Sequence, residues 1–312
     1  MQIWRSLDDV PPDLGRTCVV IGNFDGVHLG HQHVVREARQ AAEGQGLRVV
    51  AVTFDPHPMA VLRPEHAPVA ITDIATRAEL LRTAGVDDVL ALPFDLDVAS
   101  WQPEEFARRV LSEVLHAAVV VVGTNFRYGA RAAGDVVTLT ASGVDLGFQV
   151  VGVALDGGPQ VWSSTYVRTC LAAGDVAGAA EALGRPFVVR GVVVRGDRRG
   201  RELGFPTANV PTRALSAAPA DGVYAGWLRR IDTGQRYPAA ISVGTNPTFE
   251  GERERRVESY VLDRDDLELY DVEVEVAFVE RIRGMERFDG VEALVATMHD
   301  DVRTARELLG QP

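Results

Sequence analysis

The 312-residue sequence contains no lysine, so all 32 of its basic residues are arginine. This absence excludes a Schiff-base lysine, the lysine of a Walker A phosphate loop and the strand lysine of a protein kinase. Cysteine is almost absent as well, because Cys18 and Cys170 are the only two. Two thiols argue against a disulfide scaffold and against a zinc site built from thiolates.

No apolar run approaches the roughly 20 residues that a membrane span needs, and the first residues lack the basic-then-apolar order of a secretory signal. We therefore expect a cytoplasmic protein without a membrane partner. The net charge is −12. Because nucleic-acid binders show a basic footprint, no nucleic-acid partner is expected, whereas anionic small molecules remain open as ligands. The oligomeric state stays open, as a monomer or a weak assembly.

The length predicts two domains at about 150 residues each. In residues 1–184, apolar runs alternate with stretches of helical spacing. The predicted strands are 18–24, 48–54, 88–94, 117–123 and 148–154. The predicted helices are 31–44, 75–84, 103–116, 164–173 and 175–183. Strands separated by helices predict a Rossmann-like α/β domain with a parallel sheet between two helix layers.

The sequence pattern changes after Pro186, where short runs of strand-forming residues follow one another closely. Such spacing predicts a small antiparallel Greek-key β-barrel. Residues 271–279 alternate acidic and apolar side chains, which indicates a strand with one wet face. Residues 288–309 show helical spacing and predict a C-terminal helix. The fold class is therefore α/β plus all-β, with domains at 1–184 and 185–312.

The sequence GNFDGVHLGH follows the first predicted strand. Parallel sheets bind ligands at the carboxyl ends of their strands, and helix N-termini attract phosphate. His28 and His31 begin the next helix, where both can face a nucleotide α-phosphate and stabilise the charge that develops as pyrophosphate leaves. The competing interpretations are a surface turn or half of a metal site. The expected ligand-binding residues in the turn are Gly22, Asn23, Phe24, Asp25 and Gly26.

Three later segments are expected to reach the same sheet edge: TFDPHP (53–58), GTNFRYG (123–129) and SSTYVR (163–168). Asn125 offers an amide to a ligand. Ser164, Thr165 and Arg168 open a helix with two hydroxyls and a guanidinium, which suits the β- and γ-phosphates. Taken singly, Ser164 is as well explained as a helix N-cap and Phe126 as a core residue. The placement of all three segments after strands favours ligand binding.

A second candidate site lies in residues 185–312. A glycine- and arginine-rich loop leads into GFPTAN, and its backbone N–H groups can wrap phosphates. Thr207 and Asn209 share one face of a strand, and their oxygens suit Mg²⁺ that phosphates already hold. Glu258 lies on an apolar strand, where burying a carboxylate costs free energy unless it is paired or has a catalytic role. It is therefore a candidate general base. Polar strand residues and an exposed strand face are the competing interpretations. The loop residues expected to contact the nucleotide are Gly191, Gly196, Gly204 and Pro206.

In this order the motifs resemble those of the bacterial bifunctional riboflavin kinase/FAD synthetase family. GNFDGVHLGH, TFDPHP, GTNFRYG and SSTYVR are similar to its adenylyltransferase module, and GFPTAN, DGVYAG, SVGTNPTF and VE to its riboflavin kinase module. The resemblance covers about residues 5 to 309. It implies that residues 185–312 phosphorylate riboflavin with ATP and Mg²⁺ to give FMN. It also implies that residues 1–184 adenylylate FMN with ATP to give FAD and pyrophosphate.

The resemblance implies a role for each matched residue. Those implied in adenylyl transfer are the histidine pair His28 and His31 and the phosphate-binding Ser164, Thr165 and Arg168. Those implied in kinase chemistry are Thr207 and Asn209, which hold Mg²⁺-ATP, and Glu258, which activates the 5′-hydroxyl of the ribityl chain. The departures from the family pattern are Asn125 for aspartate, Tyr260 for histidine, Arg264 for an aromatic residue, and Asp271 for the glycine of LYG.

Three other functions stay open at this point. The first is an adenylyltransferase whose barrel only binds flavin, although the presence of Thr207, Asn209 and Glu258 argues against it. The second is a cytidylyl- or pantetheine-type transferase, which leaves the barrel unexplained. The third is a non-enzymatic flavin carrier, which would release neither ADP nor pyrophosphate.

Overall fold

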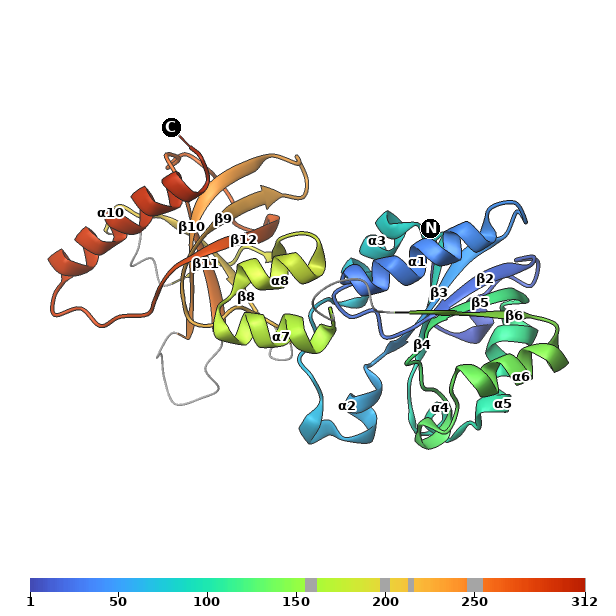
Figure 1. Cartoon of the computed structure of the whole chain (residues 1–312). Helices are drawn as coiled ribbons and strands as arrows, with labels where there is room; N and C mark the ends of the chain where they lie inside the picture. Colours follow the sequence, from blue (N-terminus) through green and yellow to red (C-terminus); the bar gives the residue numbers. More distant parts are fainter. Residues whose placement is uncertain (155–161, 197–202, 213–215, 246–254, 312) are drawn as a thin grey trace. The chain divides into compact units, whose positions relative to one another are not determined.

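The computed structural model describes residues 1–154, 162–196, 203–212, 216–245 and 255–311. By packing, the chain divides into two compact units, Met1–Ser163 and Ser164–Pro312. Figure 1 labels the helices and strands of both units. No helix in these described stretches is long and apolar enough to cross a membrane.

A six-stranded parallel sheet forms the centre of the first unit, in the order β1-β4-β3-β2-β5-β6. Its strands are β1 (Ile3–Trp4), β2 (Thr17–Ile21), β3 (Arg48–Asp55), β4 (Asp88–Pro93), β5 (Ala117–Gly123) and β6 (Gln149–Val153). The predicted parallel sheet is confirmed. β2 lies between β3 and β5, so the strand order reverses beside it, and a ligand site is expected at the carboxyl ends there.

Helices cover both faces of this sheet. The helices of the first unit are α1 (Leu29–Ala42), α2 (Pro58–Leu62), α3 (Ile74–Ala84), α4 (Leu96–Ser100), α5 (Pro103–Phe106), the π-helical η3 (Ala107–Val114) and α6 (Val136–Leu146). Figure 1 shows α1 and α3 on one face and α4 to α6 on the other. Along β2, Cys18 and Val20 join the core on the α1 side, while Val19 and Ile21 join the opposite core. Because side chains alternate along a strand, burial on both faces requires a continuous apolar run.

The second unit is built on a curled antiparallel sheet in the order β7-β12-β9-β10-β11-β8. Its strands are β7 (Phe187–Val192), β8 (Thr207–Pro211), β9 (Gly222–Arg230), β10 (Arg236–Thr245), β11 (Arg255–Val261) and β12 (Glu273–Gly284). Strands β12, β9, β10 and β11 form a Greek key, as predicted. A bridge between Val194 and Asn209 joins the two edges of the sheet.

Three helices complete the second unit: α7 (Ser164–Ala173), α8 (Val176–Leu183) and α10 (Val291–Leu308). Helix α8 packs on β7 and β12, whereas α10 packs on β9, β10 and β12. Arg283 of β12 fixes α10 by donating to both carboxylate oxygens of Asp301, each at 2.8 Å. By packing, α7 and α8 thus lie with the barrel. Compactness does not test a functional boundary, so the domains 1–184 and 185–312 stay a prediction.

Candidate functional sites

The turn between β2 and α1 is strained. Phe24 and Val27 have φ angles of +48° and +43°, although both side chains are buried. Left-handed backbone is costly for residues other than glycine, most of all for a β-branched residue. Such a conformation persists only when its surroundings impose it, and it is concentrated at functional sites.

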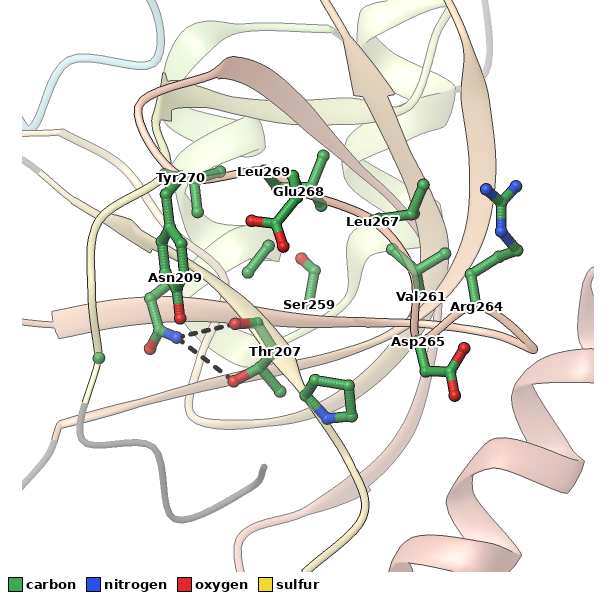
Figure 2. Close-up of a pocket in the computed structure, with 14 residues that line it drawn as sticks. Thr207, Asn209, Ser259, Val261, Arg264, Asp265, Leu267, Glu268, Leu269 and Tyr270 are labelled. Atoms are coloured by element: carbon green, nitrogen blue, oxygen red, sulfur yellow. Dashed lines mark hydrogen bonds between the residues drawn. The ribbon is translucent and has the colours of Figure 1, made fainter. Parts of the chain in front are cut away.

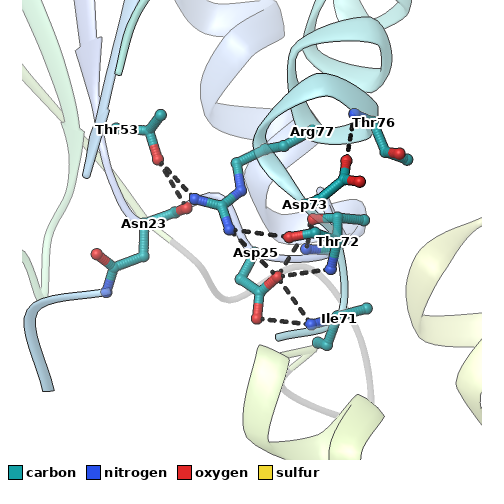
Figure 3. Close-up of polar contacts among 9 residues, drawn as sticks. Asn23, Asp25, Thr53, Ile71, Thr72, Asp73, Thr76 and Arg77 are labelled. Carbon is teal, nitrogen blue, oxygen red and sulfur yellow. Dashed lines mark hydrogen bonds and ion pairs between the residues drawn. The ribbon is translucent and has the colours of Figure 1, made fainter. Parts of the chain in front are cut away.

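Asp25 attaches this turn to the segment before α3. Its carboxylate accepts hydrogen bonds from the N–H groups of Ile71, at 3.0 Å, and Thr72, at 2.9 Å, and from the Thr72 hydroxyl at 3.2 Å. Arg77 lies 3.5 Å from the same carboxylate, as Figure 3 shows. The Asp25 side chain is 2% exposed, so it supports the turn from inside. Contact between residue 25 and a ligand stays a prediction.

The structure brings His28 and His31 together at the start of α1. The Nδ1 atom of His28 caps the helix by accepting the N–H of His31 at 3.4 Å. The two rings stack, and Phe24 meets His31 edge-on with centroids 5.2 Å apart. Gly30 between them gives the His28 ring room, since a Cβ atom there would lie 3.1 Å from that ring, a tight contact.

His31 keeps a free polar atom at this site. Its Nδ1 is buried and has no hydrogen-bond partner among the described residues. Burial, reinforced by the charges of His28 and Arg77, holds the pKa of His31 well below its usual value. The imidazole is therefore neutral near pH 7, with one N–H donor and one acceptor. An unsatisfied buried group costs about 1–3 kcal/mol, and a ligand contact would remove that cost.

An aromatic cavity of about 250 Å³ opens beside these strand ends. Its wall comes from segments that follow β2, β3, β4 and β5, and consists of Gly22, Asn23, Phe54, Pro58, Phe94, Val98, Trp101, Phe106 and residues 126–129. The rings of Phe126 and Tyr128 are nearly parallel, with centroids 5.4 Å apart. Apolar and aromatic walls of this kind suit a flat ring system. Asn125 is exposed in the turn next to this wall.

The predicted phosphate-binding residues lie on the first turns of α7, where Ser164 and Arg168 are half-buried and Thr165 is exposed. By packing, α7 belongs to the second unit. A site that combines these residues with His28 and His31 of the first unit was expected from the sequence. Their shared role stays a prediction.

In the second unit, Thr207 and Asn209 lie side by side on β8, as predicted. The Asn209 amide nitrogen donates to the carbonyl oxygen of Thr207 at 3.2 Å and to its hydroxyl at 3.3 Å, which Figure 2 shows. Gly196 passes so close that a Cβ atom there would lie 2.6 Å from Asn209 Oδ1. Gly191 is just as tight, since its Cβ would lie 2.8 Å from Val210. Of the quoted motifs, residues 197–202 and 246–249 lie outside the described residues.

A small cavity of about 60 Å³ lies beside Thr207 and Asn209. Figure 2 shows Ser259 and Glu268 turned into this space. The Ser259 hydroxyl is buried and has no partner in the part of the chain that the structure describes. Of the departures from the family pattern, Arg264 lines this cavity. Leu269 and Tyr270, which match the family pattern, line it as well. The expected loop contact Pro206 lines it as well, and Gly204 lies in the turn before β8 with φ +86°.

A larger cavity of about 250 Å³ lies between the sheet and α10. Its lining includes Phe205, Thr207, Ser242, Glu258, Tyr260, Met285, Phe288, Leu294, Met298 and Val302. Glu258 is half-buried and faces Asn209 of β8 and Ser242 of β10 across the strands. It therefore lies in a cavity wall rather than on an open strand face. Tyr260 packs edge-on against Phe205, with centroids 5.2 Å apart.

The sequence matches two protein families: FAD synthetase over residues 10–165 and riboflavin kinase over residues 183–309. A bifunctional riboflavin kinase/FMN adenylyltransferase of Escherichia coli K12 is 34% identical, covering 99% of this chain and 98% of its own. Its counterpart in Pseudomonas fluorescens is 37% identical over the same shares. A crystal structure from Streptococcus pneumoniae, described as a macrolide-efflux protein, has a TM-score of 0.87 at 32% identity. It covers 97% of this chain and 98% of its own.

Proposed function

The chain belongs to the bifunctional riboflavin kinase/FMN adenylyltransferase family, and on that premise we propose how its residues divide two reactions. The protein phosphorylates riboflavin with ATP, which gives FMN and ADP. It then adenylylates FMN with a second ATP, which gives FAD and pyrophosphate. We assign adenylyl transfer to residues 1–184 and phosphorylation to residues 185–312.

In adenylyl transfer, a phosphate oxygen of FMN attacks the α-phosphorus of ATP while the bond to pyrophosphate breaks. The attacking phosphate is already a nucleophile, so no covalent intermediate with the protein is needed. His28 and His31 supply hydrogen bonds to oxygens on which charge develops. The observation that carries this assignment is the stacked pair with its buried, unpartnered His31 Nδ1. Ser164, Thr165 and Arg168 bind the β- and γ-phosphates.

The aromatic cavity at the carboxyl ends of β2 to β5 is assigned to FMN. Stacking against Phe126 and Tyr128 would hold the flat flavin ring, whereas a solvated polar cleft would not. The exposed amide of Asn125, at the edge of this cavity, is left to bind ribose or flavin oxygens. It carries no charge, so we assign it no metal.

In the kinase reaction, Glu258 takes the proton of the ribityl 5′-hydroxyl as that oxygen attacks the γ-phosphorus of ATP and ADP leaves. The cavity between the sheet and α10 is assigned to riboflavin, because Glu258 lines it. Thr207 lines both this cavity and the smaller one. We therefore assign phosphate groups of the nucleotide to the smaller cavity, with Thr207 at the reacting phosphate between the two cavities.

Thr207 and Asn209 offer two hard oxygens that suit Mg²⁺. The Thr207 hydroxyl lies beside the Asn209 amide nitrogen, and Asn209 Oδ1 faces the space that a Cβ atom at Gly196 would fill. The described residues contain no cluster of three or more His, Cys, Asp or Glu side chains arranged for a metal. The remaining ligands would then be phosphate oxygens and water. Bound there, Mg²⁺ would neutralise charge on the transferred phosphoryl group. The cytoplasmic location, the absence of a nucleic-acid partner and the oligomeric state stay predictions.

Chromatography of flavins tests the proposal on the purified chain with riboflavin, ATP and Mg²⁺. We expect FMN to appear first and FAD to follow, with release of ADP and pyrophosphate. Conversion of supplied FMN to FAD with riboflavin untouched would instead indicate an adenylyltransferase with a binding barrel. Flavin binding without either product would indicate a carrier.

A further inference from the structure

Arg77 is a buried arginine in α3 that neither assigned reaction uses. It is 6% exposed, and a charge in that position is costly unless it is well paired. Its guanidinium donates to the Thr53 hydroxyl at the end of β3 and to the Thr72 carbonyl oxygen, each at 3.1 Å. With the Asp25 carboxylate 3.5 Å away, Arg77 connects three segments that are distant in the sequence.

These contacts continue into the strained turn itself. The Thr53 hydroxyl, which accepts from Arg77, donates to the carbonyl oxygen of Asn23 at 2.9 Å. The Thr72 hydroxyl accepts the N–H of Gly26 at 3.1 Å and donates to Asp25. Figure 3 shows Arg77 at the centre of this network. The turn is therefore held at residues 23, 25 and 26, around the left-handed Phe24 and directly before the left-handed Val27.

We propose that Arg77 is a positioning residue for adenylyl transfer. Paired with Asp25, it holds the strained turn in place and thereby sets the position of His28 and His31. The inference rests on the proposed role of the two histidines. A displacement of about 1 Å at a catalytic group can cost on the order of 100-fold in rate, so loss of this anchor is expected to act on turnover.

The same network predicts an effect that does not depend on activity. The charged or titratable groups that act on His31 are His28 in its own turn and Arg77 in α3, the latter paired with Asp25. Removing the Arg77 charge while Asp25 remains raises the pKa of His31 toward its usual value. NMR titration of the histidine ring protons measures this shift directly.

The test compares Arg77→Met with Arg82→Met, which removes an exposed arginine from the same helix. For each protein, kcat and KM are measured for FAD formation from FMN and for FMN formation from riboflavin. We expect Arg77→Met to lower kcat of FAD formation about 100-fold and to raise the pKa of His31, with FMN formation unchanged. Arg77→Lys should restore part of kcat, and Arg82→Met should match the parent.

Thr72→Val is a second test of the same network, for use if Arg77→Met does not fold. It removes the hydroxyl between Gly26 and Asp25, and we expect it to lower kcat of FAD formation about tenfold. A lower melting temperature with unchanged kcat in either variant would overturn the inference, because the network would then be merely structural. A parent chain that makes no FAD from FMN would overturn the proposed function as well.

Discussion

The imidazole rings of His28 and His31 are stacked, with centroids 3.6 Å apart and planes inclined by 25°. Two positive charges at this separation would repel each other, and the charge of His28 is one cause of the lowered pKa of His31, after burial. Because His31 is neutral, the pair carries at most one positive charge near neutral pH. It offers hydrogen bonds to phosphate without becoming a fixed dication.

The stability of the first unit is expected to depend on pH through His31. The unfolded chain binds a proton to this histidine below its ordinary pKa near 6.5, whereas the folded chain does not. Unfolding therefore takes up a proton, and the free energy of unfolding falls as the pH drops below about 6.5, by up to about 1.4 kcal/mol per pH unit. Urea unfolding at pH 7.5 and pH 5.5 measures the loss, which His31→Gln should reduce. An unchanged pH dependence in that variant would contradict the assignment.

His28→Ala is expected to slow FAD formation from FMN by about 100-fold or more, because a donor to the developing charge is lost. FMN formation should stay within twofold of the parent, measured by chromatography on the same preparation. His33→Ala is the matched control, since His33 lies on α1 with its side chain 40% exposed. Equal loss of both activities in His28→Ala would place this histidine outside the adenylyl transfer site.

Glu258→Gln should give the opposite pattern. An amide cannot accept the hydroxyl proton, so FMN formation is expected to fall by a factor of about 10²–10⁴ while FAD formation from supplied FMN continues. Glu273→Gln serves as a control, because Glu273 lies on the barrel surface in an exposed pair with Arg190. Normal FMN formation by Glu258→Gln would exclude it as the general base.

Gly196→Ala tests the close approach to Asn209. The new Cβ would lie within 2.6–2.7 Å of the Asn209 amide group, so one of the two must shift, at about 1–3 kcal/mol for overpacking. We expect KM for ATP in FMN formation to rise about tenfold or more, since 1.4 kcal/mol corresponds to a factor of ten. Gly290→Ala is the control, as its Cβ would meet nothing within 4 Å. An unchanged KM would show that this loop does not set ATP binding.

Much of the fold follows from local patterns, and the exceptions have physical reasons. The run at 117–123 predicts β5 without error, because a strand buried on both faces must be apolar throughout. The two-residue β1 is too short for any periodicity and is positioned by pairing with β4. Helix α6 was missed because valine, threonine and glycine form helices poorly. A capping box between Asp135 and Thr138 and packing of Leu139 in the core stabilise it instead.

The candidate sites divide in the same way. Pairs such as His28 with His31, or Thr207 with Asn209, are adjacent within one element, so their spacing alone indicates a shared face. The contact between Asp25 and Arg77 depends on how α3 packs, and a single arginine in a helical stretch gives no such signal. Asp25 was predicted as a ligand-binding residue, and the structure uses its carboxylate within the protein. The cavity residue Phe94 was accessible to sequence reasoning, because it is the last residue of the predicted strand 88–94.

Asn209 lies at the seam of the barrel, where the edge strand β8 meets the segment that follows β7. Its side-chain amide oxygen is assigned to Mg²⁺. Its backbone carbonyl oxygen accepts the N–H of Val194 at 2.9 Å, in the bridge that joins the two sheet edges. A nucleotide bound there would also stabilise the contact between the two sheet edges, since a ligand stabilises the conformation that binds it. With ATP assigned to this place, its binding is expected to stabilise the Val194–Asn209 bridge, and slower hydrogen exchange at the Val194 amide on addition of ATP would measure that effect.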